Sequence, residues 1–246
     1  MNNEHQETID QIRDTVAKVC EEFAGEYWRQ KDREREYPKE FVDKLTELGL
    51  LASLIPEEYG GSGLPLSVGA ETLKAIHEFG GNAGACHAQM YTMGTVLRHG
   101  SDEQKEQYLP RIASGELRLQ AFGVSEPASG SDTTSLRTRA RRDGDEYIVS
   151  GQKVWTSRAA HSDLMLLLAR TADAERVSKP SAALSVFLID LKAPAWHSIA
   201  QLVALPPLRC EALRDAMRCD AMRCDAMRCD AMRCDAMRRE GAGGGG

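Results

Sequence analysis

The sequence predicts an α+β protein, because a block of helices is followed by a block of strands. Up to about residue 115, apolar residues recur every three or four positions, which is the period of helices that bury one face. After Gly115, short apolar and β-branched runs replace that period. This segregation indicates two packed units rather than an alternating parallel α/β sheet.

The helical block contains five expected helices. They cover residues 6–31, 38–49, 66–79, 82–98 and 101–115. In the second helix, Pro38 suits the first turn and Gly49 ends it, with Phe41, Leu45 and Leu48 as the buried face.

The fifth helix has a distinct start signal. Ser101 and Gln104 have the spacing of a capping box, in which the side chain of each residue satisfies the backbone N–H of the other.

The second block contains five expected strands. They cover residues 117–124, 135–142, 146–155, 163–170 and 183–190. Asp143-Gly144 is a two-residue turn signal between the second and third strands, so these two are expected to form a hairpin.

Composition excludes several classes of function. The net charge of −6 gives no basic surface for nucleic acid, and no apolar run reaches membrane-spanning length. The polar N-terminus resembles neither a secretory nor a transit signal, so a cytoplasmic protein is expected. The spacing of the seven cysteines indicates no disulfide framework, and His87 and His99 have no partner at metal-ligand spacing.

The loop at residues 122–132, FGVSEPASGSD, is the strongest indication of a binding site. Its glycines and proline fix a tight backbone, while its serines and free N–H groups can face a polar ligand. A second segment, residues 151–157, ends in Trp155-Thr156-Ser157, an aromatic ring beside two hydroxyls. A flat ring system needs an apolar face and polar edges, so the pair predicts a planar, polar-edged cofactor.

These segments resemble the acyl-CoA dehydrogenase family. Residues 123–132 match its first signature, and Trp155-Thr156-Ser157 matches its second flavin-contacting stretch. Residues 56–61 and 108–116 are further family-like phrases in the right order, and the resemblance runs to about Lys192. The resemblance implies an N-terminal all-helical domain (1–116), a β-barrel-like middle domain (117–200) and FAD as cofactor.

The resemblance also implies roles for individual residues. The flavin contacts would come from Phe122, Gly123, Val124, Ser125, Gly130, Ser131, Trp155, Thr156 and Ser157. Ser131 would also reach the acyl-CoA substrate, while Ser125 and Ser157 would stabilise negative charge on the reduced ring. The alternative for each serine is a hydroxyl that only caps a turn.

The implied reaction is the α,β-dehydrogenation of an acyl-CoA thioester, with electrons passing on to an electron-transfer flavoprotein. In the family, a glutamate of the C-terminal helical domain is the base, and no residue of this sequence matches it. Glu126, although inside the signature, is expected to hold the loop by hydrogen bonds. We therefore expect no catalytic base, no metal, no activity beyond traces, and no family homotetramer.

Residues 201–246 are expected to form an irregular tail. It repeats the unit DAMRC four times from Asp215 and ends in glycines. A five-residue period gives neither a helix nor a strand one apolar face, which favours an expanded or frame-shifted segment without a fold. One alternative is a tail whose cysteines bind a metal or react as thiols, but their five-residue spacing disfavours a shared metal ion. The other is a short helix that mediates self-association.

The alternative to an enzyme by lineage is a non-enzymatic product. Such a chain would bind flavin weakly at most, or would associate through its tail or through exposed apolar surface.

Overall fold

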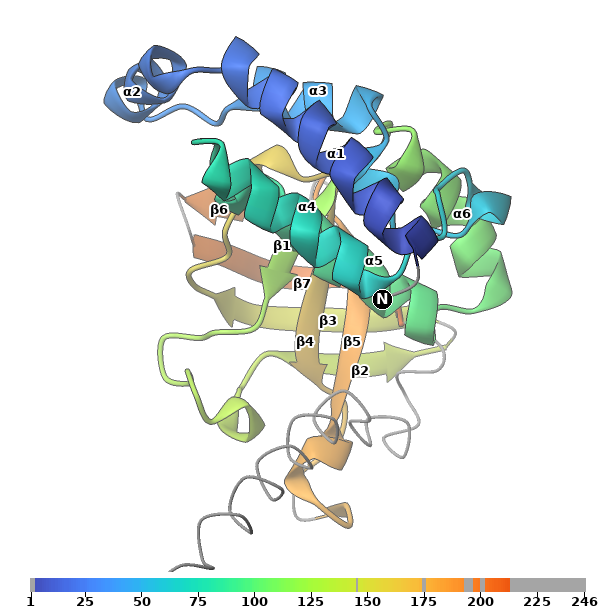
Figure 1. Ribbon diagram of the computed structural model, residues 1–246. Coiled ribbons are helices and arrows are strands. Elements are labelled where there is room, and N and C mark those ends of the chain that lie inside the picture. Colours follow the sequence, from blue (N-terminus) through green and yellow to red (C-terminus); the bar gives the residue numbers. More distant parts are fainter. Residues whose placement is uncertain (1–2, 145, 174–175, 193–196, 200–201, 213–246) are drawn as a thin grey trace, which may run out of the picture.

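The computed structural model describes residues 3–144, 146–173, 176–192, 197–199 and 202–212 (Figure 1). The DAMRC repeat lies outside these residues. Within them, the order of elements is a set of helices followed by a set of strands, so the α+β prediction is confirmed. None of the helices in the described part of the chain is both long and apolar enough to cross a membrane.

The N-terminal half consists of six α-helices. They are α1 (Asn3–Glu22), α2 (Gly25–Glu34), α3 (Lys39–Glu47), α4 (Leu66–Glu78), α5 (His87–His99) and α6 (Asp102–Ala113). In Figure 1, α1 and α4 run side by side on the outer face of this layer. The buried apolar cluster beneath them includes Val16, Phe41, Leu45 and Ile76, which is where the predicted period puts the core.

Three details of the helical prediction are wrong. The expected helix over residues 82–98 begins only at His87, because residues 83–85 form a 3-10 turn and Cys86, with φ −131°, interrupts the helix. The expected single helix over residues 6–31 is two helices, because Ala24 is extended (φ −73°, ψ 178°) and a new helix begins at Gly25. Leu48, expected to be buried, is 43% exposed, because α3 ends at Glu47 and the chain turns there. Val42 takes its place beside Phe41 and Leu45 in the core.

The predicted capping box at the start of α6 is confirmed. Ser101 Oγ accepts a hydrogen bond from Gln104 N at 3.3 Å, and Gln104 Oε1 accepts one from Ser101 N at 3.0 Å. Each side chain thus satisfies an N–H that the first turn of a helix leaves without a partner.

The strands form one mixed sheet. They are β1 (Leu119–Gly123), β2 (Arg139–Asp143), β3 (Glu146–Lys153), β4 (Leu164–Arg170), β5 (Leu184–Asp190), β6 (His197–Ile199) and β7 (Leu202–Ala212). The order β1-β4-β2-β3-β7-β5, with an added β4–β5 pairing, closes β4, β2, β3, β7 and β5 into a ring. The predicted hairpin is present, since β2 and β3 are antiparallel.

The middle unit extends beyond the expected boundary at residue 200. Strand β7 covers Leu202–Ala212 and pairs antiparallel with both β3 and β5. The first part of this strand reads LVALPPL, an apolar run that suits a strand between two neighbours. The start of the predicted tail is therefore part of the sheet.

The helices and the sheet share a buried contact along α5 and β1. Thr92 Oγ1 donates a hydrogen bond to Leu119 O at 2.5 Å. One apolar cluster contains Met93 and Ile112 from helices together with Leu119 and Leu166 from strands. The position of β1, and of the loop that follows it, is therefore set by the helical layer.

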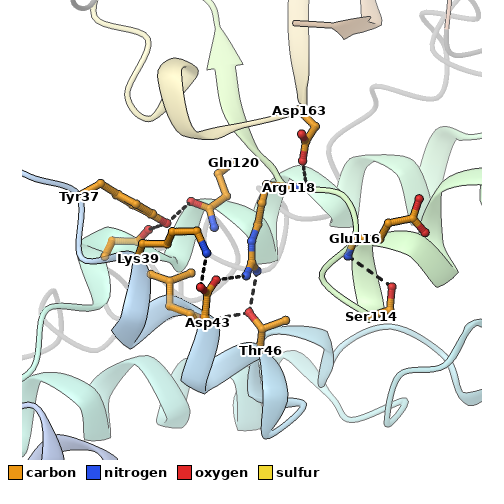
Figure 2. Close-up of polar contacts among 11 residues, drawn as sticks. Tyr37, Lys39, Asp43, Thr46, Ser114, Glu116, Arg118, Gln120 and Asp163 are labelled. Carbon is orange, nitrogen blue, oxygen red and sulfur yellow. Dashed lines mark hydrogen bonds and ion pairs between the residues drawn. The ribbon is translucent and has the colours of Figure 1, made fainter. Parts of the chain in front are cut away.

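A polar network at the start of β1 also joins the two layers, as Figure 2 shows. The Arg118 guanidinium donates to Asp43 Oδ1 at 2.9 Å and to Thr46 Oγ1 at 2.6 Å, both on α3. The backbone N–H of Arg118 donates to Asp163 Oδ2, ahead of β4, at 2.7 Å. Nearby, Tyr37 Oη donates to Gln120 Oε1 at 2.9 Å.

Candidate functional site

The two segments singled out in the sequence lie against each other. The backbone N–H of Val154 donates to Ser125 O at 2.9 Å, and Lys153 Nζ donates to Val124 O at 3.0 Å. The loop that follows β1 and the turn that follows β3 therefore form one surface, although about thirty residues of chain separate them.

A buried ion pair holds this surface together. Lys153 Nζ lies 2.8 Å from Glu126 Oε1, and the two side chains are 0% and 5% exposed. The Glu126 carboxylate also accepts hydrogen bonds from Arg137 N at 2.6 Å and Thr138 N at 2.9 Å. Three donors from two segments thus satisfy it, as expected for a carboxylate that holds a loop.

The same contacts set the protonation of the pair. Burial by itself would raise the pKa of Glu126, but hydrogen bonds from Lys153 and from Thr138 outweigh it and lower the pKa to about 2. Burial lowers the pKa of Lys153, while the Glu126 carboxylate opposes that shift. At neutral pH Glu126 is a carboxylate with very low proton affinity, and thus a poor general base.

The second carboxylate of the loop is also engaged. Asp132 Oδ1 accepts hydrogen bonds from Thr134 Oγ1 at 2.6 Å and Thr134 N at 3.1 Å, and so caps the short 3-10 helix Thr133–Ser135. Ser129 Oγ and Ser135 Oγ donate to Asp132 O at 2.7 and 2.8 Å. These two serines are therefore structural.

The three serines predicted to bind ligand differ from these structural ones. The hydroxyls of Ser125, Ser131 and Ser157 make no hydrogen bond to any other described residue. A Cβ built at Gly130 meets no atom within 4 Å, so the backbone there is open to a ligand. The loop thus keeps some hydroxyls for its own structure and leaves others free.

The turn after β3 has a strained backbone. Trp155 adopts φ 60°, in the left-handed region that side chains other than glycine's rarely occupy, and its ring is 74% exposed. Thr156 is buried, and its Oγ1 has no hydrogen-bond partner among the described residues. An exposed indole beside an unsatisfied buried hydroxyl is an arrangement that favours a ligand.

A second aromatic surface flanks the loop. Phe122 is 37% exposed, and its ring centroid lies 6.3 Å from that of Tyr91 on α5. The next residue, Gly123, is closely packed, since a Cβ there would lie 3.1 Å from Met165 Sδ and 3.2 Å from Leu167 Cδ1. Glycine therefore lets β1 pack tightly against β4 just before the loop begins.

Not all of the predicted site residues meet. Val124 and Ser125 adjoin Lys153 and Val154, but no hydrogen bond among the described residues joins Gly130 or Ser131 to the turn at 155–157. Along the described chain, no group of three or more histidine, cysteine, aspartate or glutamate side chains could hold a metal ion.

Sequence reasoning missed Lys153 and Arg158. Lys153 lies four residues after the buried Val149 on β3, and therefore on the same face of the strand. A lysine on an inward face indicates a buried carboxylate partner, so the sequence did contain a signal for this residue. Arg158 connects the turn to the helical layer, because its Nη1 donates a hydrogen bond to Gly84 O. No local sequence signal predicts that contact, because the two residues are 74 positions apart.

Comparison with known proteins gives one consistent family. Residues 3–116 match "Acyl-CoA dehydrogenase, N-terminal domain", and residues 121–213 match "Acyl-CoA dehydrogenase, middle domain". The chain is 33% identical over 166 residues to isovaleryl-CoA dehydrogenase, mitochondrial, of Bos taurus, which covers 65% of this chain and 38% of that protein. It is 32% identical over 212 residues to acyl-CoA dehydrogenase FadE12 of Mycobacterium tuberculosis strain H37Rv, which covers 84% of this chain and 53% of that protein.

A solved structure has the same fold. The acyl-CoA dehydrogenase from Geobacillus kaustophilus superposes with a TM-score of 0.76 at 22% identity, over 89% of this chain and 60% of that one. The chain spans about half the length of the two curated relatives.

Proposed function

The chain belongs to the acyl-CoA dehydrogenase family, and on that premise we propose that the loop 122–132 and the turn 155–157 form one wall of a FAD site. In this proposal Phe122 and Trp155 would lie against the ring system, and the Ser125, Thr156 and Ser157 hydroxyls would donate to its edge. Gly123 and Val124 would complete that wall, and Gly130 and Ser131 would approach the pyrophosphate, with Ser131 also near the acyl-CoA.

Three observations support the fit of a flavin. The Thr156 hydroxyl is buried without a partner, which is costly unless a ligand accepts or donates there. The Ser125 and Ser157 hydroxyls are unused by the other described residues, and the Trp155 ring is exposed at a strained position. The first of these carries the proposal, because the Thr156 hydroxyl stands in the chain between the exposed Trp155 and the unused Ser157 hydroxyl.

The reaction that we propose for the family site is the α,β-dehydrogenation of an acyl-CoA thioester. Bound FAD would accept the hydride, and an electron-transfer flavoprotein would reoxidise it. The residues of this chain would orient the ring, stabilise negative charge on its reduced form through Ser125 and Ser157, and shield the site through Phe122.

We also propose that the carboxylates of the loop take no part in proton abstraction. Glu126 is held by three donors with a pKa of about 2, and Asp132 caps a 3-10 turn. On this basis the 246-residue chain by itself would show no turnover with acyl-CoA beyond traces.

The visible absorption spectrum of the purified chain tests the proposal. After reconstitution with FAD and gel filtration, we expect flavin absorbance to co-elute with the protein. Addition of butyryl-CoA and isovaleryl-CoA is expected to perturb the spectrum without bleaching it. A colourless protein peak would refute the flavin site, while bleaching would refute only the lack of a base.

The non-enzymatic alternative is favoured by one observation, the exposure of Trp155, Tyr91 and Leu66. Exposed apolar side chains of this size promote association. Light scattering coupled to the same gel filtration separates the cases, because a flavin-free, polydisperse peak would support this alternative and a monodisperse yellow peak would exclude it.

A further inference from the structure

A cavity of about 650 Å³ lies between the C-terminal end of α2, the glycine-rich loop at 80–85 and Arg158. Trp28 and Tyr37 contribute aromatic walls. This volume suits a small organic molecule. The cavity adjoins the turn at 155–157 in sequence, but it is lined by none of the residues proposed to contact flavin.

The charges that line this cavity leave an excess of positive charge. Lys31, Arg35 and Arg158 are opposed by Asp32 and Glu36. Glu36 is already paired with Lys31, at 3.0 Å. Neither Arg35 nor Arg158 has a carboxylate partner among the residues that the structure describes. Two arginines without a carboxylate partner among the described residues therefore face one remaining aspartate.

Two N–H donors of the lining residues are buried and lack an acceptor. Trp28 Nε1 and Arg158 Nε make no hydrogen bond within the described chain. A buried donor without an acceptor destabilises a fold, and both of these donors belong to residues that line the cavity. Tyr37 Oη, which lies 2.9 Å from Gln120 Oε1 and 3.0 Å from Ala85 O, accepts from neither of these two donors.

Both arginines have a left-handed backbone conformation. Arg35 has φ 56° and Arg158 has φ 59°, and together with Trp155 they are the non-glycine residues with positive φ in the described chain. Arg35 is the left-handed C-cap of α2, and its N–H donates to Asp32 O, so its conformation is that of an ordinary helix end. Arg158 ends no helix, and strained conformations of this kind concentrate at ligand sites.

We propose that this cavity binds a small organic anion, whose carboxylate or phosphate oxygens accept hydrogen bonds from Arg158 and Trp28. Arg35, at the exposed edge, attracts the anion, and Arg158 fixes its position. The guanidinium suits this role, because Nη1 is already anchored to Gly84 O while Nε is unused.

Anion binding would be coupled to the neighbouring turn. Arg158 directly follows Ser157, so an anion that fixes Arg158 also restricts the backbone of residues 155–157 and favours flavin binding there. This coupling rests on the proposed flavin site, whereas the anion site itself does not.

Isothermal titration calorimetry of the full chain tests the site. The probes are inorganic phosphate, glutarate and uncharged glutaramide, at constant chloride. We expect saturable binding of phosphate or glutarate with a Kd of about 1 mM or below, and none of glutaramide. Binding of phosphate alone assigns the site to phosphate esters, and binding of glutarate alone assigns it to carboxylates. No saturable heat from either anion up to about 10 mM, or equal binding of glutaramide, would overturn the proposal.

Two variants and a matched control locate the binding. Arg158→Gln is expected to weaken it at least about tenfold, and Trp28→Phe, which removes the N–H donor and part of the ring, by about threefold to tenfold. Arg141→Gln, an exposed arginine on β2, removes the same charge and should leave the affinity unchanged. If Arg158→Gln fails to fold by circular dichroism, Trp28→Phe decides, and unchanged binding in Trp28→Phe then refutes the site.

The coupling between anion binding and flavin binding is tested by a separate measurement. FAD affinity, followed by flavin fluorescence, is expected to rise about threefold or more at saturating anion, and this gain should vanish in Arg158→Gln. Failure of FAD to bind under any condition would refute the flavin proposal while leaving the calorimetric result on the anion intact.

Discussion

Lys153 Nζ lies 2.8 Å from Glu126 Oε1, and this buried contact is the main tie between the loop after β1 and the turn after β3. Removal of one partner leaves the other as an uncompensated buried charge. We therefore predict that Lys153→Met lowers the free energy of unfolding by about 3–5 kcal/mol, measured by urea denaturation. Lys74→Met, which breaks the exposed pair with Glu71, should cost about 1 kcal/mol or less. Equal losses in both variants would contradict the structural role of the buried pair.

Acid stability is the second prediction. The pKa of Glu126 is lowered from 4.5 to about 2 in the folded protein, so between these values the unfolded chain binds more protons than the folded one. Stability from this group is therefore complete above about pH 4.5 and is lost as the pH falls toward 2. Between about pH 4.5 and 2, the melting temperature of the unsubstituted protein should fall more steeply with decreasing pH than that of Glu126→Gln, whose side chain has no proton to gain. Melting temperatures that fall in parallel in the two proteins would refute the lowered pKa of Glu126.

The network around Arg118 gives the third prediction. Arg118→Met removes the contacts to Asp43 and Thr46 that connect α3 to the start of β1, and it leaves a partly buried carboxylate. We expect a loss of about 1–3 kcal/mol in the free energy of unfolding. Arg141→Met, at an exposed position on β2, should change stability by about 0.5 kcal/mol or less. A neutral Arg118→Met would mean that apolar packing alone orients the two layers.

The free serine hydroxyls give the fourth prediction. Ser125→Ala and Ser157→Ala should each weaken FAD binding about fivefold to tenfold, because each removes one hydrogen bond to the ligand. Neither should change the melting temperature of the flavin-free chain, since these hydroxyls make no hydrogen bond to another described residue. Ser150→Ala, on the exposed face of β3, is the control for flavin fluorescence titrations. A melting temperature lowered in Ser125→Ala would support the turn-capping alternative instead.

Trp155 gives the fifth prediction, in which stability and binding change in opposite directions. Trp155→Gly relieves the left-handed strain at φ 60° and should raise the free energy of unfolding by about 0.5 kcal/mol. It should also weaken FAD binding about tenfold through loss of the ring. Trp155→Ala loses the ring but keeps the strain, so it should match the binding loss without the gain in stability. A gain in Trp155→Ala as well would show that exposure of the indole, and not backbone strain, is the destabilising factor.

Much of the fold could be predicted from the sequence, because its signals are local. The apolar run of β4, the Asp143-Gly144 turn and the Ser101 capping box each lie within a few residues of the feature that they specify. The break at Ala24 was missed because the apolar stripe continues through it. Strand β7 was missed because its apolar residues adjoin a repeat that has no periodic face.

The candidate site could be predicted only in part. The loop and the turn were found from their composition, and their contact through Val154 and Ser125 follows that expectation. The partner of Glu126, and the reach of Arg158 to Gly84, depend on contacts between distant parts of the chain. Sequence spacing carries no information about such contacts unless the topology is known.

The position of β7 in the ring bears on how the protein is made. It is the last described strand of the chain, yet it lies between β3 and β5. During synthesis, the edges of both earlier strands expose unpaired N–H and C=O groups until residue 212 has emerged from the ribosome. The helical layer, whose contacts are more local, can form well before that. The vulnerable species in the cell is thus a nascent chain with a finished helical half and an open sheet, and chaperone capture should peak at that length.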